Sequence, residues 1–222
     1  MDVRQAYDEW ASDYPAEAHN PLMHAEEDAV MSRLQGLTIS RALDAGAGTG
    51  RYTRILTAMG ARTVVSLDWS REMLHRQAGG AARVCGDARR LPFADAAFDL
   101  VNASLMAGDL DDLCGWLREV ARVLKPGGAL VYSDFHQAWH ERGWVRTFQD
   151  RRGHTVTMPC HLHRHDDHRQ ALATAGLALR GIDDVPVAPE VTGLKRWRPG
   201  ARAPVPALVV VSAVRDPRGA PA

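Results

Sequence analysis

Apolar and polar positions alternate along most of the chain in two patterns, short apolar runs and longer amphipathic segments. The short apolar runs, which predict buried strands, lie at residues 41–45, 63–67, 82–85, 98–103 and 129–133. Amphipathic segments between them predict helices at 50–59, 70–77 and 111–124. Strands separated by helices of this length indicate parallel β-α-β units in a doubly wound sheet.

The pattern is different at the two ends of the chain. Residues 2–35 predict two helices, and residues 144–149 and 155–158 flank a turn and predict a hairpin. A helix at 166–175 and strands at 177–182 and 207–214 would complete a sheet of seven strands. Between those last two strands, the proline-rich residues 186–206 predict a loop.

Composition narrows the classes of partner. Lys plus Arg equals Asp plus Glu, at 27 each, so no net charge favours nucleic acid or an anionic membrane, and a small-molecule substrate is expected. The three cysteines are widely spaced, which argues against a disulfide framework or a thiolate zinc site. We expect a cytoplasmic protein, because neither a signal peptide nor a run of about 20 apolar residues is evident.

A glycine-rich turn follows the first predicted strand, in the stretch Asp44-Ala45-Gly46-Ala47-Gly48-Thr49-Gly50. Glycines let the backbone turn tightly and approach a ligand, and the start of the next helix offers free N–H groups. Such a turn also occurs as a plain connection between strand and helix. Its place directly after a strand favours a ligand-binding turn.

Acidic residues end the next two strands. Asp68 lies about 20 residues beyond the turn, where an acidic residue in dinucleotide-type folds accepts hydrogen bonds from ribose hydroxyls. The alternative is that Asp68 caps the helix that begins near Ser70. Asp87 follows the third strand and is either an acceptor for an adenine amine or a solvated loop acid.

These motifs resemble those of the class I S-adenosylmethionine-dependent methyltransferases, in particular the small-molecule branch of the ubiquinone and biotin pathways. The resemblance spans residues 5–134 and rests on the glycine-rich turn, Leu67-Asp68, Gly86-Asp87-Ala88, Leu124-Lys125-Pro126-Gly127-Gly128 and a Tyr-rich N-terminal segment. It implies an α/β Rossmann-like fold, with a mostly parallel seven-stranded sheet and helices on both faces. It also implies methyl transfer from S-adenosyl-L-methionine, leaving S-adenosyl-L-homocysteine, to an O, N or C atom of a small metabolite by in-line displacement.

The resemblance further implies which residues would hold the cofactor. The glycine-rich turn would line its methionine part, Asp68 would hold the ribose, and Asp87 would contact the adenine amine. The implied set is Tyr14, Asp44, Gly46, Ala47, Gly48, Asp68, Trp69, Met73, Asp87, Ala88, Asn102, Ala103 and Ser104. This chain departs from the family at Asp109, near which relatives often carry a histidine.

With this resemblance, the chain is expected to form a single methyltransferase domain over residues 1–222. Its expected parts are a helical lid (1–35), a cofactor-binding core (36–134), a substrate-shaping insertion after the fifth strand (135–165), the C-terminal part of the sheet (166–215) and a frayed tail (216–222). The lid and the insertion are expected to set specificity, because loops on a rigid scaffold usually do so.

Catalytic and acceptor-binding candidates lie mainly in the insertion. His136 follows the fifth strand and is the first candidate for a general base, with a structural histidine as the alternative. Candidates for acceptor binding are His140, His161, His163 and Arg146, where a solvated hairpin face is the alternative for the arginine. If residues 161–165 were extended, three imidazoles would share one face, but a helix start at His165 is favoured and no metal is expected.

Two other functions remain in view. A nicotinamide-dependent oxidoreductase is disfavoured, because no Tyr-x-x-x-Lys pair is evident. A protein that binds S-adenosylmethionine without methyl transfer, such as a cyclase, a pericyclic catalyst or a regulatory binder, stays the alternative, since a fold does not fix function. We expect a monomer or a homodimer with no nucleic-acid or membrane partner.

Overall fold

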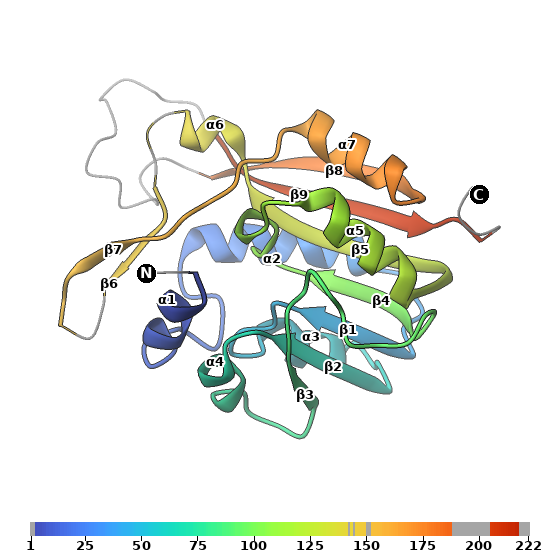
Figure 1. The fold of residues 1–222 in the computed structure, drawn as a ribbon, viewed down its shortest axis with the longest axis horizontal. Helices are drawn as coiled ribbons and strands as arrows, with labels where there is room; N and C mark the ends of the chain where they lie inside the picture. The colour runs from blue at the N-terminus through green and yellow to red at the C-terminus, as the bar shows by residue number, and fades with distance from the viewer. Residues whose placement is uncertain (1–2, 142, 144, 150–151, 188–204, 218–222) are drawn as a thin grey trace.

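The computed structural model describes residues 3–141, 143, 145–149, 152–187 and 205–217 of the chain. Seven strands form one sheet in the order β3-β2-β1-β4-β5-β9-β8 (Figure 1). Their bounds are β1 Arg41–Ala45, β2 Thr63–Asp68, β3 Ala82–Cys85, β4 Phe98–Ala103, β5 Leu124–Phe135, β8 Leu177–Val187 and β9 Val205–Arg215. A second, two-stranded sheet pairs β6 (Thr147–Gln149) with β7 (Thr155–Thr157).

Strands β1 to β5 run parallel, and β9 lies antiparallel between β5 and β8. The strand order reverses at β1, because β2 and β3 lie on one side of it and β4 and β5 on the other. Open α/β sheets bind ligands at such a switch point, outside the carboxyl ends of the strands. The predicted doubly wound, mostly parallel sheet is confirmed.

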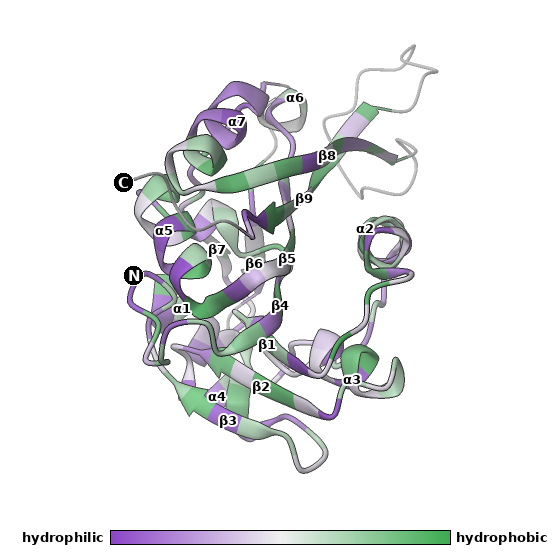
Figure 2. Ribbon diagram, turned by 90° about the vertical axis from the view of Figure 1, so that its right-hand side faces the viewer, coloured by the Kyte–Doolittle hydropathy of each residue, from purple (hydrophilic) through white to green (hydrophobic). Residues whose placement is uncertain are grey.

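Helices cover both faces of this sheet (Figure 2). On one face, α2 (Pro21–Leu34) and α3 (Arg51–Ala58) pack apolar side chains against the strands. On the other face, α5 (Leu113–Val123) and α7 (His165–Thr174) do the same. The helix after β2, α4 (Arg71–His75), begins where the Ser70 hydroxyl accepts a hydrogen bond from Met73 N at 3.1 Å.

The junction between α5 and β5 differs from the prediction. Helix α5 begins where the Asp112 carboxylate accepts a hydrogen bond from Gly115 N at 2.8 Å, and it ends at Val123. Strand β5 then starts at Leu124, whereas the sequence predicted a turn before a strand at 129. Residues 125–128 are an irregularity in the pairing with β4, and Gly127 has a φ of +78°, which glycine adopts without steric cost.

The N-terminus and the insertion meet in space. Helix α1 (Val3–Trp10) packs on the β6–β7 hairpin through a small apolar cluster that includes Ala6, Phe148 and Met158 (Figure 1). The rings of Trp10 and Phe148 stack with centroids 5.2 Å apart. We call α1 and the hairpin together the cover. The predicted lid of residues 1–35 is thus divided, because α1 belongs to the cover and α2 to the sheet layer.

A buried carboxylate fixes α2 to the sheet. Glu26 is fully buried, and its Oε2 accepts hydrogen bonds from Arg51 Nη2 (2.6 Å) and Tyr52 OH (2.8 Å) of α3. Its Oε1 accepts one from Ser133 Oγ of β5 at 2.6 Å. These contacts offset the desolvation of the charge and join α2 and α3 to strand β5.

Other predicted elements differ mainly at their ends. Strand β8 runs on to Val187, beyond the predicted end at 182. Two short elements were not predicted, a 3-10 helix η1 (Ala107–Asp109) and α6 (Gln137–His140). Most of the predicted 186–206 loop, Trp144 of the predicted hairpin and residues 218–222 of the predicted tail lie outside the described residues. Within the described residues, no helix has the length and apolarity to cross a bilayer.

Candidate functional site

The glycine-rich turn after β1 is held close to β2. Gly46 N and Ala47 N donate hydrogen bonds to the Leu67 carbonyl at 2.8 and 3.0 Å. Gly46 has a φ of +69°, and a Cβ there would lie 2.6 Å from Met106 Cγ, so only glycine fits. At Gly48 (φ +53°) a Cβ would meet nothing within 4 Å. That open side leaves room for a ligand next to the backbone.

Asp68 ends β2 beside this turn. Its Oδ2 accepts a hydrogen bond from Gly48 N and its Oδ1 one from Ser70 N, both at 2.8 Å. Burial raises the pKa of the carboxyl group to about 6, although the two N–H groups act to lower it. Each carboxylate oxygen has a second lone pair, so Asp68 can still accept hydrogen bonds from ligand hydroxyls.

An open cavity of about 630 Å³ lies at this edge of the sheet. The predicted cofactor residues that line it are Tyr14, Gly46, Gly48, Asp68, Trp69, Met73, Asp87, Ala88 and Ser104. The fold therefore brings most of the predicted set together around one cavity, which we call the cofactor cavity.

Some predicted cofactor residues do not line it, namely Asp44, Ala47, Asn102 and Ala103. Asp44 is buried in β1, where its Oδ2 accepts a hydrogen bond from Thr53 Oγ1 at 2.7 Å. The Asn102 side chain of β4 donates a hydrogen bond from Nδ2 to Asp44 Oδ1 at 3.4 Å. Burial raises the pKa of Asp44 to about 6. Asp44 thus ties α3 and β4 to β1, and its contact with a methionine amino group stays a prediction.

Other lining residues were absent from the predicted set, namely Tyr7, Leu67, Gly86, Leu105, Met106, Asp109 and Leu110. Several of them follow β4, a segment without a strong motif. One feature of the sequence did indicate this segment. Asp109 departs from the family pattern, and it follows a strand that ends at the ligand-binding edge.

Asp109 belongs to a buried cluster with Tyr7 and Arg146. Tyr7 OH donates to Asp109 Oδ2 at 3.0 Å, and Arg146 Nη1 donates to Tyr7 OH at 3.2 Å. Arg146 Nη2 pairs with Asp109 Oδ1 and donates to the Pro159 carbonyl at 2.9 Å. Arg146 is only 6% exposed, so it does not lie on a solvated hairpin face. The cluster joins α1, the segment after β4 and the insertion.

A second cavity, of about 360 Å³, lies between β5 and the insertion. Its lining residues are Phe135, His136, Val145, Arg146, Met158, Cys160 and Leu162. Asp134 is buried close to Cys160 of this cavity. Both side chains face Gly108, where an added Cβ would lie 2.8 Å from Asp134 Oδ1 and 3.0 Å from Cys160 Sγ. Burial and the charge of Asp109 raise the pKa of Asp134 to about 7, against the opposing charge of Arg146.

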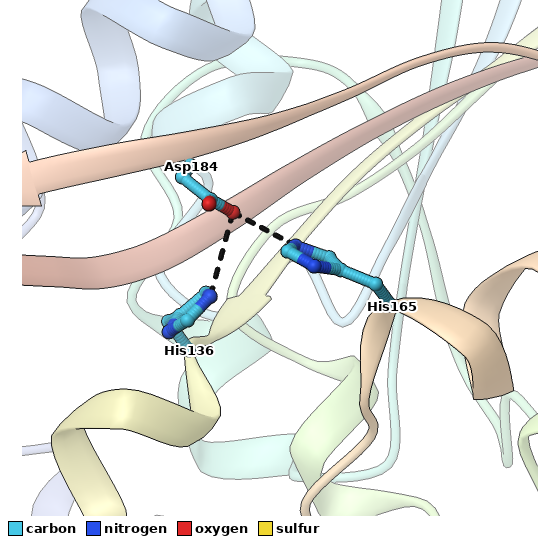
Figure 3. A group of neighbouring side chains, drawn as sticks. All are labelled: His136, His165 and Asp184. Atoms are coloured by element: carbon cyan, nitrogen blue, oxygen red, sulfur yellow. Dashed lines mark ion pairs between the residues drawn. The ribbon is translucent and has the colours of Figure 1, made fainter.

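His136 is buried between this cavity and β8, and each of its ring nitrogens has a polar neighbour (Figure 3). Nδ1 accepts a hydrogen bond from Ala138 N at 3.0 Å, and Nε2 lies 3.4 Å from Asp184 Oδ1. Burial lowers the pKa of His136, although the Asp184 carboxylate raises it. The role of His136 as a base stays a prediction.

His136, His165 and Asp184 have the residue types of a metal site, with ligand atoms within 4.8 Å of one another (Figure 3). His165 Nε2 lies 2.8 Å from Asp184 Oδ1. A neutral imidazole whose Nδ1 accepts an N–H carries its proton on Nε2, whereas a metal needs the Nε2 lone pair. Metal-bound histidines usually donate their other N–H. The Ala138 contact therefore favours a carboxylate between two imidazoles over a metal site.

The histidines at 161, 163 and 165 do not share one face, because residues 158–164 form no strand. Each of them has different surroundings. His161 is exposed, and His163 Nε2 lies 3.1 Å from the Leu110 carbonyl, which it can donate to. Neither lines the cofactor cavity or the second cavity. Their roles in acceptor binding stay predictions. His140 ends α6, and its side chain lies outside the described part of the structure.

The part of the chain that forms much of the cofactor cavity is similar to a known protein family. Residues 43–132, which contain most of β1, all of β2 to β4 and most of β5, match the model of the methyltransferase domain family. This stretch of the chain is therefore similar to methyltransferase domains. The family predicted from the motifs is confirmed for this part of the chain.

Curated relatives are similar over the same region. Malonyl-[acyl-carrier protein] O-methyltransferase from Enterobacter lignolyticus is 36% identical over 132 residues, which cover 54% of this chain and 52% of the relative. Demethylmenaquinone methyltransferase from Mycolicibacterium vanbaalenii is 44% identical over 111 residues, which cover 48% and 47%. This chain thus spans about half the length of the curated relatives it matches.

Solved structures share the fold over more of the chain. An S-adenosylmethionine-dependent methyltransferase from Mesorhizobium loti superposes with a TM-score of 0.68 at 23% identity, covering 86% of this chain and 98% of its own. A [4+2]-cyclase superposes with the same TM-score at 17% identity, covering 96% of each chain. At these identities the similarity establishes the fold alone, because one fold supports different chemistries.

Proposed function

We propose that this protein transfers a methyl group from S-adenosyl-L-methionine to an O, N or C atom of a small molecule. The observation that carries the proposal is the cofactor cavity, where the glycine-rich turn, Asp68 and Asp87 meet at the switch point of a methyltransferase domain. Both curated relatives named above are methyltransferases, which supports the same activity.

The residues of the cavity fit this cofactor. Asp68 accepts hydrogen bonds from the ribose hydroxyls, Trp69 and Met73 flank the adenine, and the open side of Gly48 admits the methionine part. Tyr14, from the connection between α1 and α2, closes over it. When bound, S-adenosylmethionine supplies a methyl group on a sulfonium, which is already an activated electrophile.

The protein's task is therefore to align the acceptor and to exclude water. Proximity and orientation alone can contribute roughly 7–11 kcal/mol in well-oriented reactions. The cover is placed for this task, since Tyr7 of α1 lines the cofactor cavity and is tied to Arg146 of the insertion. We also propose a monomer or homodimer in the cytoplasm, with no nucleic-acid partner, from the balanced charge.

Product analysis tests the proposal. The protein is incubated with methyl-deuterated S-adenosylmethionine and a panel of small alcohols, phenols, amines and carboxylic acids, and products are followed by mass spectrometry. We expect one deuterated methyl group on a product, formed together with S-adenosylhomocysteine and lost in Asp68→Ala. The [4+2]-cyclase with the same fold keeps a second function in view, catalysis without transfer. Conversion without a mass gain would favour it and contradict methyl transfer.

A further inference from the structure

Two buried polar atoms beside the second cavity have no hydrogen-bond partner among the described residues. They are Arg146 Nε and Asp134 Oδ2, on side chains that are 6% and 1% exposed. Buried polar atoms in folded proteins are nearly always paired, so an unpaired one calls for an explanation such as a ligand or an ordered water. The other polar contacts of both residues are satisfied, which leaves these two atoms as the available ones.

The two atoms are chemically complementary and belong to one cluster. Arg146 lines the second cavity, and its charge acts on both Asp134 and Cys160. Arg146 Nε offers a hydrogen to donate, and an ionised Asp134 Oδ2 offers lone pairs. A hydroxyl group can accept and donate at once, so one ligand hydroxyl is suited to both atoms.

We propose that the second cavity binds the methyl acceptor, and that this acceptor is a neutral, largely apolar molecule with a hydroxyl group. The hydroxyl accepts a hydrogen bond from Arg146 Nε and donates one to Asp134 Oδ2. Phe135, Met158 and Leu162 supply apolar wall for the rest of the molecule, with the half-exposed Val145 also in the lining. The role as acceptor rests on the proposed function, whereas the binding of such a molecule does not.

Charge at the cavity decides against an anionic ligand. The guanidinium of Arg146 is already paired with Asp109, and Asp134 adds a second carboxyl group to the same cluster. A carboxylate ligand would therefore meet two acidic groups and one shared cation. The two cavities adjoin at the Asp109–Arg146 pair, since Asp109 lines one and Arg146 the other. The hydroxyl thus lies on the side of the second cavity that adjoins the cofactor.

A matched set of probes tests this inference. Equilibrium dialysis measures the dissociation constants of 2-naphthol, naphthalene and 2-naphthoate with protein saturated with S-adenosylhomocysteine. We expect 2-naphthol to bind about tenfold tighter than the other two probes, because its hydroxyl group supplies the hydrogen bonds that Arg146 Nε and Asp134 Oδ2 lack. Asp134→Leu and Arg146→Lys should abolish the preference for the hydroxyl, so that each variant binds 2-naphthol and naphthalene equally. Leu162→Trp, which fills the cavity, should weaken all three probes.

Several results would overturn the inference. They are equal binding of the three probes, tighter binding of 2-naphthoate, and binding that survives Leu162→Trp. Calorimetry of S-adenosylhomocysteine with each variant shows whether it is folded, and Arg146→Lys keeps the test open if Asp134→Leu does not fold. If the wild type fails to bind S-adenosylhomocysteine, the proposed function falls. Dialysis without that ligand then still tests the second cavity.

Discussion

Three buried carboxyl groups lie along the ligand-binding edge of the sheet, Asp44 on β1, Asp68 on β2 and Asp134 on β5. Burial raises their pKa values to about 6, 6 and 7. A carboxyl group with a raised pKa makes the folded state less stable as pH rises, and such groups gather at functional sites. Asp134 has the highest value of the three and an unpaired oxygen among the described residues.

Asp134→Asn should stabilise the protein more at pH 8 than at pH 5. The pKa of Asp134 is near 3.8 when unfolded and about 7 when folded, so its burial becomes less favourable as pH rises from 4 to 7 and stays so above 7. We expect the stability difference between variant and wild type to grow by about 2 kcal/mol from pH 5 to pH 8. Urea unfolding at both pH values measures it. The exposed Asp28→Asn is the control, and parallel pH dependences would contradict the prediction.

The strands and helices of the core were predictable because each one carries its own periodic pattern, as the 98–103 strand and the α5 helix show. The junction at Leu124 was not, since Pro126 and the following glycines normally end a strand. The cover was also beyond sequence reasoning. Its contacts join residues far apart in the chain, such as Trp10 and Phe148. A local sequence pattern can show that a segment has an apolar face, but not which other segment that face packs against. Most of the cofactor cavity was predicted, but the Asp109–Arg146 pair was not.

Glu26 should contribute far more to stability than its neighbour Glu27. Glu26→Ala leaves Arg51 without its buried partner, and we expect a loss of about 3–5 kcal/mol. Glu27 lies 3.4 Å from the same guanidinium but is partly exposed, so Glu27→Ala should lose less than about 1 kcal/mol. Chemical denaturation of both variants measures the difference. Equal losses would mean that the Glu26 network does not fix α2 to the sheet.

At the scale of the whole molecule, the cover links the start of the chain to the insertion and closes over the sheet edge. Trp10 stacks on Phe148 but does not line the cofactor cavity. Any effect of Trp10 on a bound cofactor must therefore pass through the cover or through Tyr14, whose ring lies edge-on to that of Trp10 with centroids 4.8 Å apart.

Trp10→Ala should release S-adenosylhomocysteine faster. Loss of an aromatic pair worth about 0.5–1.5 kcal/mol predicts a dissociation rate roughly three- to tenfold higher. Stopped-flow displacement measures the rate. Leu179→Ala, at an exposed apolar position on β8, is the control and should leave the rate unchanged. An unchanged rate in Trp10→Ala would show that the contacts of Trp10 with Phe148 and Tyr14 do not help to retain the ligand.

The most direct test of the cofactor site is calorimetric titration of S-adenosylmethionine and S-adenosylhomocysteine into the wild type, Asp68→Ala and the control Asp28→Ala. The proposed site predicts micromolar binding by the wild type and the control. It predicts binding at least about tenfold weaker, a change of 1.4 kcal/mol, in Asp68→Ala. If the folded wild type binds neither ligand, the cavity at the glycine-rich turn is not a cofactor site.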